Sequence, residues 1–270
     1  MTTSSGMLAA RSSVLRALAQ LDQELGPTLP PGVPHAPAAE TRLAAGMPAL
    51  LDEPLLDVAA FHTALRAIAR VLEADPSLAP AARTADRLAA DPELGPALVA
   101  AALAGDWDTI ETTVARAGLD TDTAIALADY AVRPWLRLAA ESIRAVLQSA
   151  NWRAGYCPAC GAPPLLAELR GSEHERVLRC GRCASAWSFP RLACPACGEQ
   201  KHQRLGSLHA ENQLDFLRVD ICESCGTYVK AIAVLDPLPA AELQLADLKS
   251  TALDFAALER GYRRASARPI

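Results

Sequence analysis

Eight cysteines arranged as four Cys-x-x-Cys pairs constrain this 270-residue chain more than any other feature of its sequence. All of them lie between Cys157 and Cys225, and neither the 156 residues before them nor the 45 residues after them contain another. A change in composition this abrupt predicts two kinds of module that are stabilised by different chemistry. The four pairs are Cys157 and Cys160, Cys180 and Cys183, Cys194 and Cys197, and Cys222 and Cys225.

Each pair has the spacing of a metal-binding knuckle, a tight turn that points two thiolates at one ion. Gly161, Gly198 and Gly226 follow three of the pairs and can supply the positive φ that such a turn tends to need. The first and second pairs are separated by 19 residues and the third and fourth by 24, and each gap fits a β-hairpin that brings its ends together. We therefore predict two four-thiolate sites, one formed by Cys157, Cys160, Cys180 and Cys183 and the other by Cys194, Cys197, Cys222 and Cys225.

Other cysteine chemistry fits this pattern less well. The N-terminal residues lack the features of a secretory signal, so we expect the cytosol, where structural disulfides are rare. A thioredoxin-like centre needs its Cys-x-x-Cys at a helix start in a βαβ unit, and iron–sulfur clusters usually space their cysteines differently. We expect His174, His202 and His209 to be surface residues, because eight thiolates already complete two tetrahedral sites. The spacing does not distinguish zinc from iron.

The predicted fold class is α+β and multidomain: an N-terminal all-helical domain, two tandem rubredoxin-like or zinc-ribbon β modules, and a C-terminal helix. We place the helical domain at residues 1–150, the first ribbon at 151–192, the second ribbon at 193–238, and the C-terminal helix and tail at 239–270. Apolar residues that recur at a period of 3.6 predict helices, and short β-prone runs predict strands. Expected helices are 12–25, 54–74, 91–104, 107–117, 121–149 and 240–262, expected strands are 165–170, 175–179, 186–189, 206–209, 214–221 and 227–235, and the proline-rich residues 28–40 should form an extended loop.

Composition and charge exclude several classes of protein. An apolar content of 51% is too high for a disordered chain, and no charge-free apolar run approaches the ~20 residues of a membrane-spanning helix. The net charge is -5, and residues 151–235 contain ten Lys and Arg against eight Asp and Glu. Bound thiolates would make this segment more acidic, which is a poor footprint for nucleic acid. We therefore expect neither membrane insertion nor nucleic-acid binding.

The cysteine-rich segment resembles the FdhE family. The matching stretches are Tyr-Cys-Pro-Ala-Cys-Gly at 156–161, Leu-Arg-Cys-Gly-Arg-Cys at 178–183 followed by Trp187 and Arg191, Cys-Pro-Ala-Cys at 194–197, and Cys-Glu-Ser-Cys-Gly-Thr-Tyr-Val-Lys at 222–230. The tail from Asp247 to Asp254, with Gly261 and Tyr262, also looks like the C-terminal helix of the family. The resemblance is specific over about residues 151–265, and over residues 1–150 it is one of domain order alone.

This resemblance implies an accessory protein that active respiratory formate dehydrogenases require. Such a protein would contact the molybdenum-containing catalytic subunit of formate dehydrogenase in the cytoplasm, before that subunit is exported. The resemblance also implies rubredoxin-like sites with the eight cysteines as ligands, iron as the metal and zinc as the alternative. It gives no role to Trp187, Tyr228 or Lys230, and it leaves open whether the protein forms a homodimer.

The sequence therefore favours a binding protein over an enzyme, because it contains no Ser-His-Asp set, phosphate-binding loop or paired-carboxylate motif. Two alternatives remain: a rubredoxin-like electron-transfer protein and a zinc-ribbon nucleic-acid binder. The helical domain is expected to be a scaffold, and His62 within it is expected to be structural, because it has no partner at ligand spacing.

Overall fold

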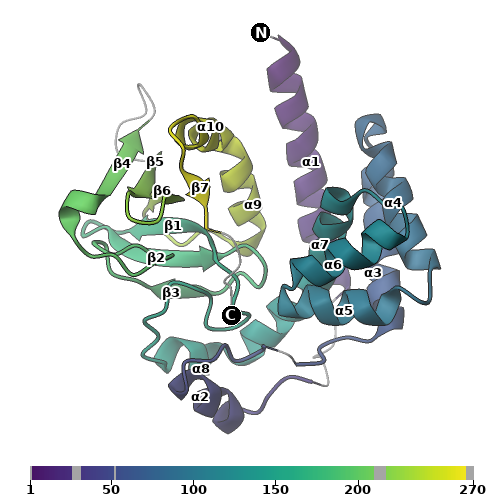
Figure 1. Ribbon diagram of the computed structural model, residues 1–270, viewed down its shortest axis with the longest axis horizontal. Helices are drawn as coiled ribbons and strands as arrows, with labels where there is room; N and C mark the ends of the chain where they lie inside the picture. Colours follow the sequence, from purple (N-terminus) through teal and green to yellow (C-terminus); the bar gives the residue numbers. More distant parts are fainter. Residues whose placement is uncertain (1, 26–31, 52, 210–216, 266–270) are drawn as a thin grey trace. The chain divides into compact units, whose positions relative to one another are not determined.

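The computed structural model describes residues 2–25, 32–51, 53–209 and 217–265 (Figure 1). The chain divides into a helical unit, Met1–Ala39 with Leu50–Arg144, and a sheet unit, Glu40–Ala49 with Ala145–Ile270. The predicted fold class is confirmed: a helical N-terminal region precedes a sheet that carries two four-cysteine clusters, and helices follow the sheet. None of the described helices is both long and apolar enough to cross a membrane.

The helical unit is built on the apolar stripe of α3. Phe61, Leu65 and Ile68 recur at helical spacing and are buried, as the periodicity predicts. Aspartates cap three of the helices: the carboxylate of Asp57 accepts a hydrogen bond from the amide of Ala60, and Asp106 and Asp120 act in the same way. The helices of this unit are α1 (Thr2–Leu25), α3 (Val58–Glu73), α4 (Ala79–Ala90), α5 (Gly95–Ala104), α6 (Trp107–Arg116) and α7 (Thr121–Ser142).

Several expectations for the N-terminal half were wrong in part. Helix α4 was not expected, and the helix expected over 91–104 begins only at Gly95. Residues Ala36–Ala44 form helix α2, so the predicted extended loop ends before residue 36, because Pro37 fits the first turn of a helix without breaking it. The first part of that loop, residues 28–31, lies outside the described residues. The long helix expected over 121–149 continues through Pro134, ends at Ser142, and is followed by the short helix α8 (Arg144–Ser149).

The sheet unit joins both predicted ribbons into one sheet. Its strands are β1 (Pro164–Arg170), β2 (Glu175–Cys180), β3 (Ala186–Ser188), β4 (Leu205–His209), β5 (Leu217–Cys222), β6 (Thr227–Val234) and β7 (Arg263–Arg264). The order is β3-β2-β1-β6-β5-β4, and β7 pairs with β6. The first ribbon supplies β1–β3 and the second supplies β4–β6, and the two ribbons meet where β1 runs parallel to β6. The first three residues of the strand expected at 214–221 lie outside the described residues.

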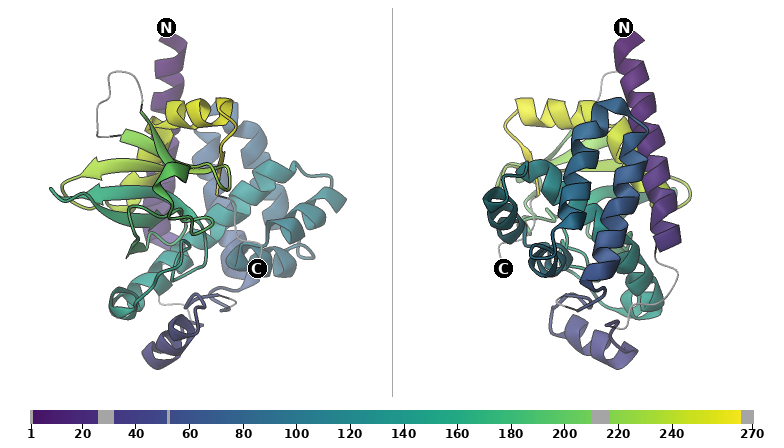
Figure 2. Two further views of the ribbon diagram at one scale, coloured as in Figure 1. Left: turned by 60° about the vertical axis from the view of Figure 1, so that its left-hand side comes forward. Right: turned by 90° about the vertical axis from the view of Figure 1, so that its right-hand side faces the viewer.

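Two helices pack against one face of this sheet, where a single helix was expected. The predicted helix over 240–262 divides at Ser250 into α9 (Ala240–Lys249) and α10 (Thr251–Glu259), which lie beside the strands in Figures 1 and 2. The Ser250 hydroxyl donates to the carbonyl groups of Ala246 and Asp247 at the break. The apolar core beneath α10 is formed by Val219, Tyr228, Leu253 and Ala257.

Candidate metal centres

All four Cys-x-x-Cys pairs adopt the same turn. The amides of Gly161, Gly198 and Gly226 each donate to the carbonyl of the cysteine four residues earlier, at 2.9–3.0 Å. These glycines have φ between 66° and 77°, as the sequence predicts. The remaining turn places Ala184 in the same position at φ 62°, a conformation that costs a residue with a Cβ roughly 1–2 kcal/mol. Each knuckle is thus set by its own backbone.

The structure brings the thiols together in the two groups of four that the spacing predicts. We call Cys157, Cys160, Cys180 and Cys183 centre I, and Cys194, Cys197, Cys222 and Cys225 centre II; within each group all sulfur atoms lie within 4.8 Å of one another. The closest Sγ–Sγ distances are 3.4 and 3.5 Å in centre I and 3.7 Å, twice, in centre II. A tetrahedron with metal–sulfur bonds of about 2.3 Å has edges of about 3.8 Å, so both groups could hold a metal ion.

The two centres differ in their exposure to solvent. All four cysteines of centre I are buried. In centre II, Cys194 and Cys222 are buried, whereas Cys197 is exposed and Cys225 is half-buried. A hydroxyl group contacts a sulfur atom in each centre: Ser185 Oγ lies 3.2 Å from Cys183 Sγ, and Thr227 Oγ1 lies 2.9 Å from Cys225 Sγ. One side of centre II is therefore accessible from outside the protein.

Burial disfavours the thiolate forms of two of these cysteines when no cation is bound. Burial raises the pKa of Cys157 well above that of an ordinary thiol, and hydrogen bonds with the other thiols of centre I raise it further. Burial also raises the pKa of Cys194 in centre II. A divalent ion would stabilise the thiolate forms and release their protons on binding, so metal binding at these centres would be coupled to folding.

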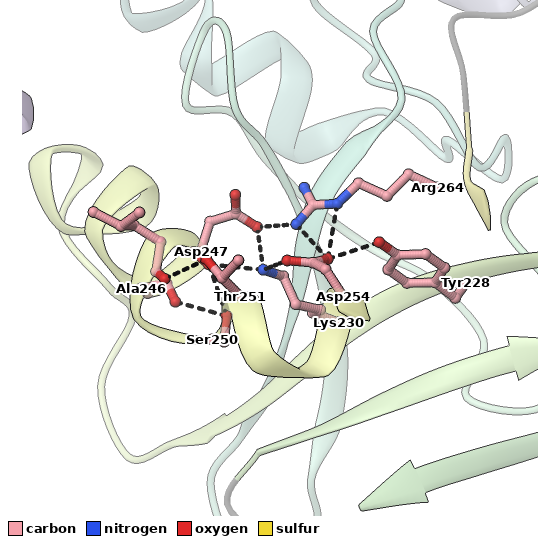
Figure 3. A network of polar contacts seen from close by, with 9 residues as sticks. Tyr228, Lys230, Ala246, Asp247, Ser250, Thr251, Asp254 and Arg264 are labelled. Carbon is pink, nitrogen blue, oxygen red and sulfur yellow. Dashed lines mark hydrogen bonds and ion pairs between the residues drawn. The ribbon is translucent and has the colours of Figure 1, made fainter. Parts of the chain in front are cut away.

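A buried polar network lies between the sheet and α9–α10, and its residues have no role that the sequence predicts (Figure 3). Lys230 of β6 is 1% exposed, and its Nζ lies 2.7 Å from the carboxylates of both Asp247 and Asp254. Arg264 of β7 binds the same two carboxylates at 2.5 and 2.8 Å, and the Tyr228 hydroxyl donates to Asp254 at 2.7 Å. We call these five residues the clamp, because they join β6, α9, α10 and β7.

The clamp and its surroundings use charges where a sheet face would ordinarily use apolar packing. Burial alone would raise the pKa of Asp254, but hydrogen bonds from Lys230, Tyr228 and Arg264 outweigh it and hold this pKa below its ordinary value. Burial and the bond to Asp254 raise the pKa of Tyr228 to about 12. On the same sheet face, fully buried Glu168 forms ion pairs with Arg170 and Arg179.

Trp187 and the histidines considered in the sequence belong to neither centre. The Trp187 indole donates to the carbonyl of Ala154 at 3.1 Å and so ties β3 to the loop before the first knuckle. None of the three histidines considered as ligands belongs to a described cysteine cluster. The His62 side chain packs against Gly95 in the helical unit, where a Cβ added to the glycine would lie 2.8 Å from His62 Nε2.

Three comparisons identify what the chain is similar to. The family model described as "FdhE, C-terminal domain" matches residues 192–270. A "Protein FdhE homolog" from Pseudomonas aeruginosa is 38% identical over 116 residues, and one from Aquifex aeolicus is 31% identical over 116 residues. The solved structure titled "The crystal structure of the FdhE protein from Pseudomonas aeruginosa" has a TM-score of 0.69 and 25% sequence identity, and the match covers 96% of this chain and 94% of that chain. By sequence the chain is thus similar to FdhE proteins over its cysteine-rich and C-terminal part, and by fold it is similar to the Pseudomonas aeruginosa FdhE protein over nearly its whole length.

The matches to FdhE relatives differ in extent. The alignments cover 41% of this chain and 37% of the Pseudomonas aeruginosa relative, and 42% of this chain and 40% of the Aquifex aeolicus relative. The chain thus spans about two fifths of the curated relatives it matches, whereas the structural match extends over nearly all of both chains. The FdhE C-terminal model includes centre II and the whole clamp.

Proposed function

We propose that this protein is an accessory protein of respiratory formate dehydrogenase that acts by binding rather than by catalysis. In this role it engages the catalytic subunit in the cytoplasm before export. The similarity to FdhE proteins supports this function, and the single structural observation that carries it is the pair of four-thiol centres on one continuous sheet.

The eight cysteines of centres I and II are the proposed metal ligands. Their sulfur atoms have the spacing of a tetrahedral four-thiolate site. The resemblance to the FdhE family favours iron, with zinc as the alternative, since the geometry itself suits either metal. When bound, each ion cross-links two knuckles and supplies folding free energy. The chain itself supplies the rest of the site: three glycines and Ala184 shape the turns, and Ser185 and Thr227 contact sulfur.

Protein prepared without oxygen tests the metal assignment. Elemental analysis should give two ions per chain, and the absorption spectrum should show charge-transfer bands if the ions are iron. Two zinc ions and a colourless protein would exclude the iron assignment. One ion per chain would show that only one centre binds metal, and a count near zero would refute metal binding at either centre.

Capture of the partner tests the binding role. Tagged protein should recover the catalytic subunit of formate dehydrogenase from cells that respire formate, and a variant with Cys157→Ser and Cys222→Ser should recover less because each centre loses a ligand. Repeated failure of the unaltered protein to recover that subunit would refute the proposed function.

The exposed side of centre II favours electron transfer as a second candidate function. An iron ion beside the exposed Cys197 would lie close to the surface, where a redox partner could approach. Absorption bands that disappear with a reductant and return with an oxidant would support this role. A spectrum that does not respond to either reagent would exclude it.

A further inference from the structure

Two cavities flank centre II, and arginines line both of them. One has a volume of about 220 Å³ and is lined by Arg176, Arg191 and Arg218. The other has a volume of about 470 Å³ and is lined by Arg153 and Arg263. Both cavities also share Cys194, Pro195 and Thr227 as lining residues. We call the five arginines the arginine rim; they come from five separate segments of the sheet unit.

Most of the positive charge of the rim is not neutralised within the described part of the protein. Asp220 pairs with both Arg218, at 2.7 Å, and Arg176, at 3.4 Å, so one carboxylate serves two guanidinium groups. Arg153 and Arg191 bind neutral groups, the side-chain amide of Asn151 and the carbonyl of Glu173. The side chain of Arg263 has no bond to any described residue.

This excess remains when centre II holds an ion. Four thiolates around a divalent ion carry a charge of -2, whereas the five rim arginines share one carboxylate, that of Asp220, and so keep an excess of four positive charges. The rim therefore keeps a positive excess in a chain whose net charge is -5. The carboxylates of Glu199 and Glu223 also lie at the knuckles of centre II, where Glu199 accepts a hydrogen bond from Ser224 and Glu223 pairs with Arg204. Three rim residues, Arg153, Arg191 and Arg263, are exposed and can reach a partner.

The buried member of the rim has a different task. Arg176 is 3% exposed, and its Nη1 donates to the carbonyl of Ala193 at 2.9 Å, directly before Cys194. Arg176 therefore fixes the backbone just before Cys194, and its buried charge adds to the positive potential around centre II. The exposed arginines remain as the groups that would make direct contact.

We propose that the arginine rim binds an acidic patch on the catalytic subunit of formate dehydrogenase and thereby covers the open side of centre II. The proposal rests on the proposed function and identifies the face of this chain that the partner meets. Guanidinium groups bind carboxylates through two parallel hydrogen bonds, which favours arginine at such a surface. Tyr156 and Phe189 line the larger cavity, and aromatic residues combined with arginine are typical of the residues that dominate protein interfaces.

The distribution of charge favours a protein over a nucleic acid. A polyanion backbone is bound by a basic stripe that neutralises several successive phosphates. The rim instead surrounds two separate cavities that meet at a centre carrying negative charge. This arrangement of arginines suits a folded protein that presents a few carboxylates at fixed positions.

The experiment uses the full-length protein, prepared without oxygen and shown to contain two ions. Affinity and association rate for the purified catalytic subunit are compared between the unaltered protein and the variant Arg153→Gln/Arg263→Gln. Both residues are exposed and neither is a cysteine ligand, so metal content should not change. The control variant, Arg83→Gln/Arg116→Gln, removes the same charge from two exposed positions of the helical unit.

The rim variant should associate about tenfold more slowly at low salt, and its binding should depend less on ionic strength, because charges at an interface act mainly on the association rate. The partner should also protect Cys197 from alkylation by iodoacetamide in the unaltered protein. The control variant should bind like the unaltered protein.

The outcomes separate the two proposals. If the unaltered protein does not bind the subunit, the proposed function fails. If the rim variant binds as well as the unaltered protein, the proposed function survives and the rim proposal is overturned. Arg191→Gln provides the same test should the double variant lose metal. A single-stranded oligonucleotide that binds more tightly than the subunit, with the same dependence on Arg153 and Arg263, would also overturn the rim proposal.

Discussion

Replacing Lys230 by methionine tests whether the clamp holds α9 and α10 on the sheet. The variant keeps the unbranched stem of the side chain and removes the charge. It leaves the carboxylates of Asp247 and Asp254 half-paired, because each loses an ion pair of 2.7 Å and keeps its bond to Arg264. Nζ also loses its bond to the carbonyl of Asp247, so that group is left without this donor.

The free energy that Lys230→Met should cost lies at the lower end of the range measured for a broken buried ion pair. Removing one partner of such a pair costs about 3–5 kcal/mol. Lys230 is fully buried, but the side chains of Asp247 and Asp254 are 21% and 15% exposed and can gain some hydration. We therefore expect a loss of about 3 kcal/mol, which corresponds to a change of more than about 100-fold in the equilibrium for opening the clamp.

Hydrogen exchange measures this opening directly. Amides in α9 and α10 of the metal-loaded variant should exchange about 100-fold faster than in the unaltered protein, because exchange reports local opening. Lys201→Met is the matched control, since Lys201 is exposed and its substitution should leave these rates unchanged. Adding Asp254→Asn to Lys230→Met should cost less than the sum of the single changes, because the two residues are in contact. An acceleration of less than about tenfold, equivalent to about 1.4 kcal/mol, would show that the clamp is no stronger than a surface ion pair.

Three further predictions concern the cysteine ligands of the two centres, the close contact between Gly155 and Pro195, and the stability of the protein at low pH. Cys157→Ser should lose one of the two ions outright, whereas Cys197→Ser should retain part of its ion, because a water molecule can replace an exposed ligand but not a buried one; equal losses by elemental analysis would contradict this. Gly155→Ala should lower the stability of the sheet unit by about 3 kcal/mol in thermal unfolding, since its Cβ would lie 1.8 Å from the carbonyl oxygen of Pro195. Gly206→Ala, which meets only the Ile221 side chain at 3.3 Å, should have a much smaller effect. The pKa of Asp254 is lower in the folded than in the unfolded protein, so its contribution to the free energy of unfolding is complete above about pH 4 and is lost as the pH falls through the folded pKa. The stability difference between the unaltered protein and Asp254→Asn should therefore shrink below pH 4. A difference that stays constant down to pH 2 would exclude this linkage.

Local chemistry made the two cysteine groups predictable from the sequence. The turn of each knuckle is fixed by residues within five positions of one another, and the hairpin lengths leave one natural way to combine the four turns. The parallel pairing of β1 with β6 was not predictable in this way. It joins residues more than 60 positions apart, and nothing in either strand specifies that edge as its neighbour.

The clamp was missed because charged residues far apart in the sequence carry no sign of their partners. One signal was present: Lys230 is the only charged residue within the apolar strand Thr227–Val234. A lysine at the centre of such a strand needs a buried counter-ion. Asp247 and Asp254 lie seven residues apart, which would place them on one face of a continuous helix. In the structure the helix is interrupted at Ser250, and both carboxylates point towards Lys230.

Strand β6 links centre II to the clamp. Successive side chains of a strand point to opposite faces of the sheet. Thr227 contacts the sulfur of Cys225 on one face, whereas Tyr228 binds Asp254 on the other. The short strand β7 pairs with β6 at these same two positions, so Arg263 belongs to the arginine rim and Arg264 to the clamp. Opening the clamp should therefore loosen the strand that carries Arg263. If the arginine rim binds the catalytic subunit as proposed, Lys230→Met should slow that association although Lys230 itself is buried.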